Sequence, residues 1–231
     1  MSKNISSKKI IIVIPAFNEA KWLAKVINDV KREGFMNIVV VDDGSTDNTC
    51  EVAERENVIV IKHLINRGPG AATQTGLMFA KLKDADMAVT IDADGQHDPK
   101  DIKRLIEEME SQKLDLVFGS RFLEKSNRIP LLKKIFNKIA DFITFVLSTL
   151  WVSDSQTGLK VFSKKALEKI IINTSGFEFC TEIFMQVRLN KLKFEEVPIK
   201  VNYEVESQKK GQNFATGIST LFKLFLEAIT K

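Results

Sequence analysis

Short apolar runs rich in β-branched residues alternate with amphipathic segments along the first half of the chain. The apolar runs span residues 10–14, 38–41, 58–61, 87–91 and 114–118. Their lengths are typical of strands buried on both faces. Apolar residues recur at helical spacing between these runs, at residues 18–31, 68–82 and 99–109, and a short helix is expected after residue 47. This alternation predicts an α/β fold, with a mostly parallel, Rossmann-like central sheet flanked by helices.

The pattern changes after residue 121. A long helix is predicted at residues 129–151, basic at its beginning and apolar afterwards. Further strands are expected at residues 159–162 and 194–203, shorter helices at 164–171 and 180–189, a polar loop at 204–213 and an amphipathic helix at 215–230. We expect a single domain over residues 1–231, in which residues 123–231 complete a site begun by residues 9–122.

Composition narrows the classes of function. The chain is 44% hydrophobic and 28% charged, with 5 Pro and 11 Gly, which excludes disordered and collagen-like proteins. A net charge of +4 permits anionic partners such as nucleotides, phosphates or acidic lipid and does not require nucleic acid, so no nucleic-acid partner is expected. The polar N-terminus and the lack of a long apolar run predict a cytoplasmic protein without a transmembrane helix.

Polar motifs follow four successive predicted strands. They are PAFNE at residues 15–19, DDGSTD at 42–47, NRGPGAA at 66–72 and DADGQHD at 92–98. In open α/β sheets, ligands bind at the carboxyl ends of the strands. The four motifs therefore predict one site at this edge of the sheet.

The motif at residues 92–98 predicts a metal site. Asp92 and Asp94 end a buried strand, where carboxylates are costly unless a cation or hydrogen bonds compensate them. With the amide oxygen of Gln96 they form a hard-oxygen set suited to Mg²⁺ or Mn²⁺, which neutralises the charge on a departing diphosphate. The alternative is a turn that caps the next helix, which explains Asp98 better than it explains the other two acids.

Two other motifs leave alternatives open. Asp42 and Asp43 could hydrogen-bond a base or ribose, or could belong to a simple strand-to-helix turn. NRGPGAA could offer backbone N–H groups to a phosphate or could be a close-packed helix start. It has neither the P-loop pattern nor GxGxxG, which argues against a dinucleotide oxidoreductase.

Together, VIPAFNEA, VVDDGSTDNT, NRGPGAA, TIDADGQHDP and FGSRF resemble, in order and spacing, the inverting family 2 glycosyltransferases of the GT-A fold. The later DSQTGLKVFSKKAL and EEVPI are similar to the branch of dolichol-phosphate mannose synthase and dolichyl-phosphate glucosyltransferase. The resemblance implies metal-dependent transfer of a hexose from a nucleoside-diphosphate sugar (UDP- or GDP-linked) to a polyprenyl or dolichyl phosphate. DSQTG is closer to the glucosyl-type pattern, which favours a UDP-sugar.

The resemblance also implies roles for individual residues. Its nucleotide-sugar pocket is lined by Pro15, Ala16, Asn18, Glu19, Asp42 and Asp43. Asp92, Asp94 and Gln96 would hold Mg²⁺ or Mn²⁺ together with the diphosphate. Arg121 would contact phosphate, and Lys133 and Asn137 occupy the acceptor-phosphate positions, where the branch usually has Arg and Ser.

The acceptor decides whether a base is needed. A phosphate monoester is largely dianionic at pH 7 and attacks without a base, so Asp94 and Arg121 would be the catalytic residues. Asp154 is the candidate general base if the acceptor is a hydroxyl. The alternatives to a lipid acceptor are a soluble glycosyltransferase acting on a saccharide or protein hydroxyl and a non-catalytic nucleotide-sugar-binding protein, which would not need both metal carboxylates.

A lipid acceptor also requires access to a membrane surface. The helices predicted at residues 129–151 and 215–230 each have an apolar stripe and basic residues. Such helices lie either at a membrane interface or against the protein core. Peripheral contact with the cytoplasmic face of a membrane is therefore a hypothesis that depends on the resemblance.

Overall fold

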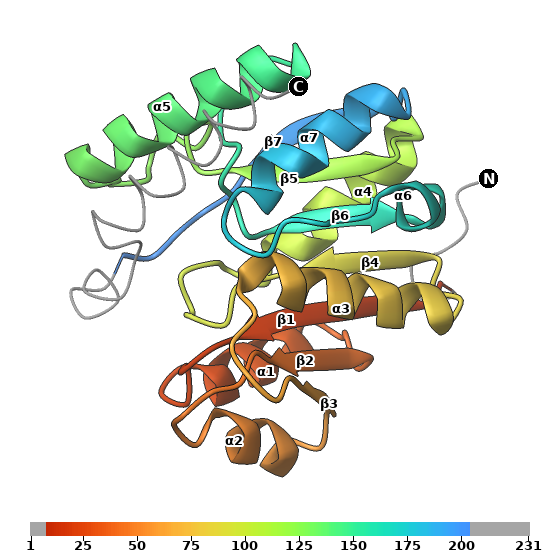
Figure 1. Cartoon of the computed structure of the whole chain (residues 1–231), viewed down its shortest axis with the longest axis vertical. Helices are drawn as coiled ribbons and strands as arrows, with labels where there is room; N and C mark the ends of the chain where they lie inside the picture. Colours follow the sequence, from red (N-terminus) through yellow and green to blue (C-terminus); the bar gives the residue numbers. More distant parts are fainter. Residues whose placement is uncertain (1–7, 204–231) are drawn as a thin grey trace.

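A computed structural model describes residues 8–203, and its centre is a seven-stranded sheet in the order β3-β2-β1-β4-β6-β5-β7 (Figure 1). The strands are β1 (Ile10–Ala16), β2 (Ile38–Asp42), β3 (Ile59–Lys62), β4 (Met87–Thr90), β5 (Leu116–Ser120), β6 (Lys160–Ser163) and β7 (Phe194–Pro198). Neighbouring strands are parallel, except that β6 runs antiparallel to both β4 and β5. The predicted mostly parallel α/β fold is confirmed, and strands from both halves of the chain share one sheet.

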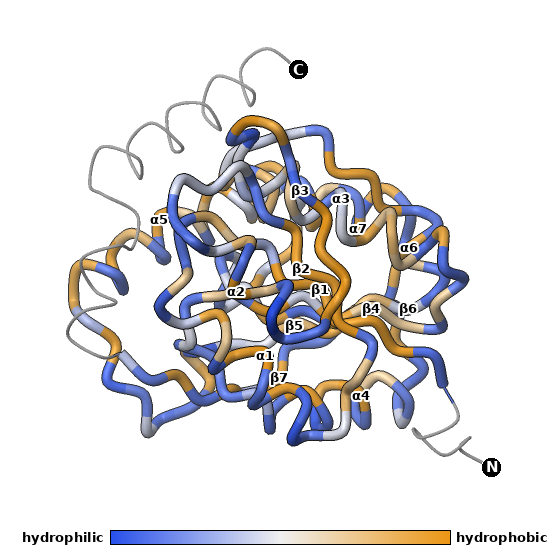
Figure 2. The backbone as a smooth tube through the Cα atoms, turned by 90° about the horizontal axis from the view of Figure 1, so that it is seen from below, coloured by the Kyte–Doolittle hydropathy of each residue, from blue (hydrophilic) through white to orange (hydrophobic). Residues whose placement is uncertain are grey.

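Helices cover both faces of this sheet. They are α1 (Leu23–Arg32), α2 (Thr49–Arg55), α3 (Pro69–Leu82), α4 (Asp101–Gln112), α5 (Leu131–Ser148), α6 (Lys164–Lys169) and α7 (Phe179–Leu189). In β1, Ile12 packs into the core under α1 and α4, whereas Val13 packs into the core under α3, α6 and α7. Successive strand side chains point to opposite faces, so an uninterrupted apolar run is required when both faces are covered. Figure 2 shows hydrophobic colouring along the central strands.

Two predicted boundaries are wrong by five residues. Helix α1 begins at Leu23 instead of residue 18, because Asn18 has a left-handed backbone (φ 55°) that a helix does not accept. Strand β7 ends at Pro198 instead of residue 203. The predicted polar loop at residues 204–213 and the terminal helix at 215–230 lie outside the described residues.

Helix α5 lies at one edge of the molecule, beside α7 (Figure 1). The hydroxyls of Thr144 and Thr181 bond at 2.8 Å between the two helices. Large apolar side chains on α5 are exposed, at Leu131, Leu132, Ile135, Ile139, Phe142, Phe145 and Val146. Within residues 8–203, however, no helix combines the length and the apolar character needed to cross a bilayer.

Candidate active site

The loops after β1 and β2 interlock at the carboxyl edge of the sheet. The amide of Asp43 donates to the carbonyl of Ala16 at 2.8 Å, and the amide of Asn18 donates to Ser45 Oγ at 3.0 Å. The side-chain oxygen of Asn18 accepts the amide of Thr46 at 2.8 Å. This contact explains why Asn18 keeps its left-handed backbone, and it brings two of the predicted motifs together.

Asp42 has one carboxylate oxygen without a hydrogen-bond partner in the described part of the chain, and its role in nucleoside binding stays a prediction. Its carboxylate is fully buried, and Oδ1 accepts the amide of Ser45 at 3.1 Å. No donor among the described residues reaches its buried Oδ2. A buried acceptor without a donor is costly, so this oxygen is suited to an N–H or hydroxyl of a ligand. Pro15 and Ala16 lie next to it, in register with Val41 and Asp42.

Asp43 has a different environment from its neighbour. Its Oδ1 lies 2.6 Å from Nδ1 of His63 and accepts the amide of Arg67 at 3.0 Å, while Oδ2 accepts the amide of Gly68 at 2.7 Å. Both oxygens therefore hold the loop before α3. A direct role for Asp43 in ligand binding remains a prediction. Glu19, also predicted to line the pocket, donates its amide to Thr49 Oγ1 at 2.8 Å.

The glycine-rich start of α3 is closely packed. The amide of Gly70 donates to the carbonyl of Ser175 at 2.8 Å. A Cβ at Gly68 or Gly70 would collide with the backbone of residues 174–175, and Gly68 also has a left-handed φ of +96°. Of the two interpretations of NRGPGAA, the structure therefore favours the close-packed helix start over the phosphate cradle.

The two predicted metal carboxylates follow β4. Oδ1 of Asp94 accepts the amide of Gln96 at 2.9 Å, and Oδ2 of Asp92 lies 3.3 Å from Nε2 of His97. Desolvation and the adjacent Asp92 carboxylate raise the pKa of Asp94. Gly158 packs so tightly on Asp92 that a Cβ there would collide with the carboxylate. The segment around residue 158 therefore forms one wall of this site.

These residues fit a divalent cation shared with a ligand. No group of three His, Cys, Asp or Glu side chains that could hold a metal occurs among residues 8–203. At the predicted site a cation would take a few oxygens from the protein and the others from phosphate and water, as Mg²⁺ and Mn²⁺ do. It would also relieve the repulsion that raises the pKa of Asp94. The contribution of the Gln96 side chain stays a prediction.

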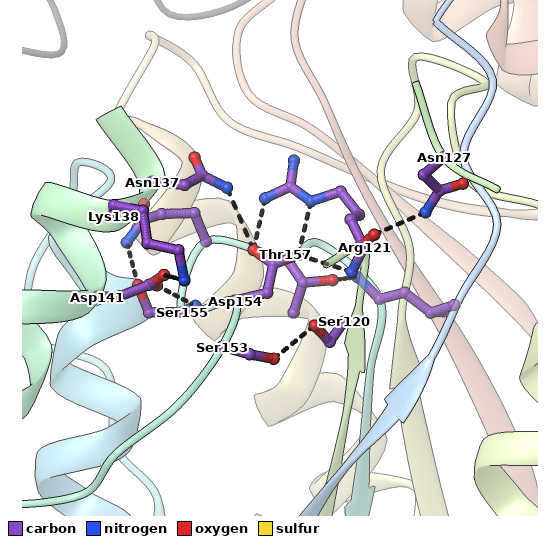
Figure 3. Close-up of polar contacts among 12 residues, drawn as sticks. Ser120, Arg121, Asn127, Asn137, Lys138, Asp141, Ser153, Asp154, Ser155 and Thr157 are labelled. Carbon is purple, nitrogen blue, oxygen red and sulfur yellow. Dashed lines mark hydrogen bonds and ion pairs between the residues drawn. The ribbon is translucent and has the colours of Figure 1, made fainter. Parts of the chain in front are cut away.

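Arg121 and Asp154 form a buried bidentate ion pair (Figure 3). Asp154 Oδ2 accepts Nε of Arg121 at 2.7 Å and its amide at 3.0 Å, and Oδ1 accepts Nη2 at 2.6 Å. Asn137, a predicted acceptor-phosphate residue, donates to Oδ1 at 3.3 Å. With both oxygens engaged, Asp154 is placed to orient Arg121, whose third guanidinium nitrogen points away from it. Its role as a general base remains a prediction.

Lys133 of α5 is within electrostatic reach of Arg121 and Asp94. Its Nζ lies 4.5 Å from the centre of the Tyr203 ring. Burial and the charge of Arg121 lower the pKa of Lys133, while the charge of Asp94 acts in the opposite direction. An anion bound between Lys133 and Arg121 would offset their mutual repulsion. The loop that holds Asp154 against Arg121 also packs Gly158 against Asp92, so the predicted metal carboxylates and the predicted phosphate-binding cations are joined by this segment.

Two acids of this network, buried Asp141 and half-buried Glu196, were not assigned a role from the sequence. Asp141 of α5 and Glu196 of β7 both accept backbone N–H groups of the loop at residues 153–155. For Asp141 the signal available in the sequence was a carboxylate inside an apolar helix, whereas Glu196 stands beside Glu195 and differs from it only in its place in the alternation of the strand. Such a signal indicates a partner without identifying it.

Asp141 supports a prediction about pH. Burial raises its pKa to about 6; its Oδ1 accepts the amide of Ser155 at 2.8 Å, while Oδ2 accepts no hydrogen bond from the described residues and lies 3.9 Å from Nζ of Lys138. Because the folded state binds this proton more tightly than the unfolded state, stability falls as pH rises from about 4 to about 6. Asp141→Asn should remove this loss. Between about pH 4 and about pH 6, the free energy of unfolding of the variant should therefore rise by roughly 2–3 kcal/mol relative to that of the wild type.

Urea unfolding of both proteins at pH 4 and pH 7 measures this difference. Exposed Glu107 lies on α4, away from the network, so Glu107→Gln is the matched control and should follow the wild type. Parallel pH profiles for Asp141→Asn and the wild type would contradict the prediction.

Comparison with known proteins identifies a matching family, similar sequences and a similar solved structure. The sequence pattern of the family described as Glycosyl transferase family 2 matches residues 11–171. The chain is 41% identical to an uncharacterised protein of Methanocaldococcus jannaschii, over 97% of this chain and 94% of that protein. It is 37% identical to the UDP-N-acetylglucosamine–dolichyl-phosphate N-acetylglucosaminyltransferase of Methanococcus voltae, over 96% of this chain and 97% of that enzyme.

A solved structure shares the fold. Glucosyl-3-phosphoglycerate synthase from Mycobacterium tuberculosis, crystallised with Mn²⁺, UDP and glucosyl-3-phosphoglycerate, matches with a TM-score of 0.68. The match covers 95% of this chain and 80% of that one at 17% identity. At that identity the likeness concerns the fold alone.

Proposed function

The chain belongs to glycosyl transferase family 2, and from this premise we propose that it moves a hexose, with inversion, from a nucleoside-diphosphate sugar to a polyprenyl or dolichyl phosphate. One observation carries the proposal beyond the family. Gly158 packs against the Asp92 carboxylate, and Asp154, four residues before it, bonds Arg121, whose charge and that of Asp94 both act on Lys133. Such a site suits a donor diphosphate on one side and an acceptor phosphate on the other.

We favour UDP as the nucleotide of the donor. The methanococcal relative carries UDP-N-acetylglucosamine in its name, and its likeness extends over nearly the whole chain. Asp42 Oδ2, buried and without a donor among residues 8–203, is suited to an N–H of the base, which uracil and guanine both offer, so the preference for UDP rests on the relative. The transfer assay should therefore compare a UDP-linked N-acetylhexosamine with UDP-glucose.

Asp92, Asp94 and Gln96 would hold the divalent cation, which supplies positive charge to the diphosphate as it departs. The protein's own cations have a separate task. Arg121, fixed by Asp154, and Lys133 would hold the acceptor phosphate against the repulsion of the donor. In this scheme the carboxylates serve the metal and the donor diphosphate, and the cationic side chains serve the acceptor phosphate.

The reaction needs no proton transfer. An oxygen of the acceptor phosphate dianion forms a bond to the anomeric carbon while the bond from that carbon to the nucleoside diphosphate breaks, in line and with inversion. The electron pair of the broken bond leaves with the diphosphate. Because the phosphate is already ionised near pH 7, a general base is unnecessary. The engagement of both Asp154 oxygens by Arg121 agrees with this scheme.

Helix α5 connects the site to a membrane surface in this proposal. Its inward residues include Lys133 and Asn137, while its exposed face carries Leu131, Leu132 and Phe142. Lys134 and Lys138 border an apolar groove on that face, together with Ile135, Ile139 and Phe142. Apolar side chains next to lysines suit an interface with anionic lipid.

The test incubates the chain with Mn²⁺, polyprenyl phosphate in anionic vesicles, and labelled UDP-glucose, UDP-N-acetylglucosamine or GDP-mannose in parallel. We expect label from a UDP-sugar in a chloroform-soluble product, loss of transfer in excess chelator, and sedimentation of the chain with the vesicles. Label in a water-soluble saccharide or in protein would support a hydroxyl acceptor instead. Nucleotide binding without transfer to any acceptor would contradict the proposal.

A further inference from the structure

Three consecutive backbone amides, those of residues 153–155, are held by two carboxylates from distant elements. Glu196 accepts the amide of Ser153 at 2.8 Å through Oε2 and the amide of Asp154 at 3.0 Å through Oε1. It also accepts the hydroxyl of Ser153 at 2.9 Å. Asp141 accepts the next amide, that of Ser155, at 2.8 Å. The loop is therefore fixed from β7 on one side and from α5 on the other.

This loop presents the carboxylate that orients Arg121. Asp154 is the middle one of these three residues, and its side chain bonds the Arg121 guanidinium at 2.6 and 2.7 Å (Figure 3). A displacement of its backbone would therefore move Arg121. Each of these hydrogen bonds has a donor–acceptor distance within the normal range, so a small displacement of the loop would lengthen them.

Glu196 is placed by the sheet itself. Strands β5 and β7 are parallel neighbours, and Glu196 pairs with Phe118 two residues before Ser120, where β5 ends. Ser120 and Ser153 then bond through their hydroxyls at 2.7 Å, which ties the end of β5 to the same loop. Arg121 follows Ser120 directly in sequence. The end of β5, the loop at residues 153–155 and the guanidinium of Arg121 are therefore joined by direct hydrogen bonds.

Placing a charged carboxylate at residue 196 costs free energy, because the side chain is partly removed from water. Burial raises the pKa of Glu196, whereas its bonds to residues 153 and 154 lower it. The adjacent Glu195 is exposed, as expected when successive strand residues point in opposite directions. A neutral or apolar residue would avoid the cost at residue 196, but it could not accept several N–H donors at once.

We propose that Glu196 is a positioning residue, which fixes the loop at residues 153–154 so that Asp154 holds Arg121 towards the acceptor phosphate. This inference rests on the proposed function. It assigns Glu196 no contact with substrate, and its effect should therefore pass through Arg121. A purely structural role would lower stability without a selective effect on the acceptor.

Glu196→Gln tests the proposal with minimal change of shape, because it replaces one acceptor oxygen by an NH₂ group that faces the loop amides. We expect kcat/KM for polyprenyl phosphate to fall roughly 10–100-fold, as small misplacements of catalytic groups do. The thermal shift produced by UDP with Mn²⁺ should remain. Glu195→Gln is the matched control and should keep wild-type kinetics.

A double-mutant cycle with Arg121→Lys separates positioning from structure. If Glu196 acts through Arg121, Glu196→Gln should have little further effect in the Arg121→Lys background. Additive losses, or an unchanged kcat/KM in the single variant, would overturn the proposal. Should Glu196→Gln fold poorly, Ser153→Ala removes one of the same bonds and should reduce kcat/KM in the same direction by a smaller factor.

The wild type distinguishes the two levels of inference. Absence of lipid-linked product with wild-type protein would count against the proposed function. An active wild type together with a fully active Glu196→Gln variant would count against the positioning role alone.

Discussion

Asp94→Ala is expected to abolish sugar transfer without unfolding the protein. The loss of several kcal/mol of electrostatic stabilisation at a metal site corresponds to roughly a 10³-fold or larger fall in rate. The fold should survive because desolvation and Asp92 already disfavour the charge of Asp94. In the absence of metal the melting temperature of the variant should therefore equal or exceed that of the wild type.

Two measurements check this expectation. Transfer to polyprenyl phosphate should vanish, and the Mn²⁺-dependent thermal shift with UDP should be lost. Asp98 lies in the same motif, where its side chain accepts the amide of Lys100 at 3.1 Å, so Asp98→Asn is the control and should keep both properties. Normal turnover by Asp94→Ala, or by the wild type in excess chelator, would remove the basis of the proposed site.

The layers of the fold follow from local sequence, but several details do not. An uninterrupted run such as Ile10–Ala16 already indicates a strand with two covered faces. The antiparallel direction of β6 depends on how its connections cross the sheet, and no local pattern encodes it. The late start of α1 depends on the bond between Asn18 and Thr46, two residues from different loops.

For the site, too, some features could be predicted from the sequence and others could not. The motifs after β1, β2 and β4 could be assigned to one edge because strand ends of a parallel sheet meet there. Asp42 and Asp43 are chemically identical neighbours, yet only the structure shows that Asp43 is held by His63 and the loop before α3. The contacts of Ser153 and Ser155 with Glu196 and Asp141 are long-range, and a single sequence carries no signal for such pairs.

Asp154→Ala should cost roughly 3–5 kcal/mol in the free energy of unfolding and should also abolish transfer. The substitution leaves the Arg121 guanidinium, whose side chain is only 15% exposed, without the carboxylate that bonds it at 2.6 and 2.7 Å. An uncompensated buried charge is the main cause of the expected loss of stability. Without its orienting partner, Arg121 should also no longer hold the acceptor phosphate.

A second substitution separates these two effects. Asp154→Ala combined with Arg121→Met removes both charges, so most of the stability measured by urea unfolding should return, while transfer stays absent. If the double variant is as unstable as Asp154→Ala alone, the ion pair is not the source of the loss. If Asp154→Ala retains transfer, Asp154 does not position Arg121 for the reaction, and the link from Glu196 through Asp154 to the acceptor fails with it.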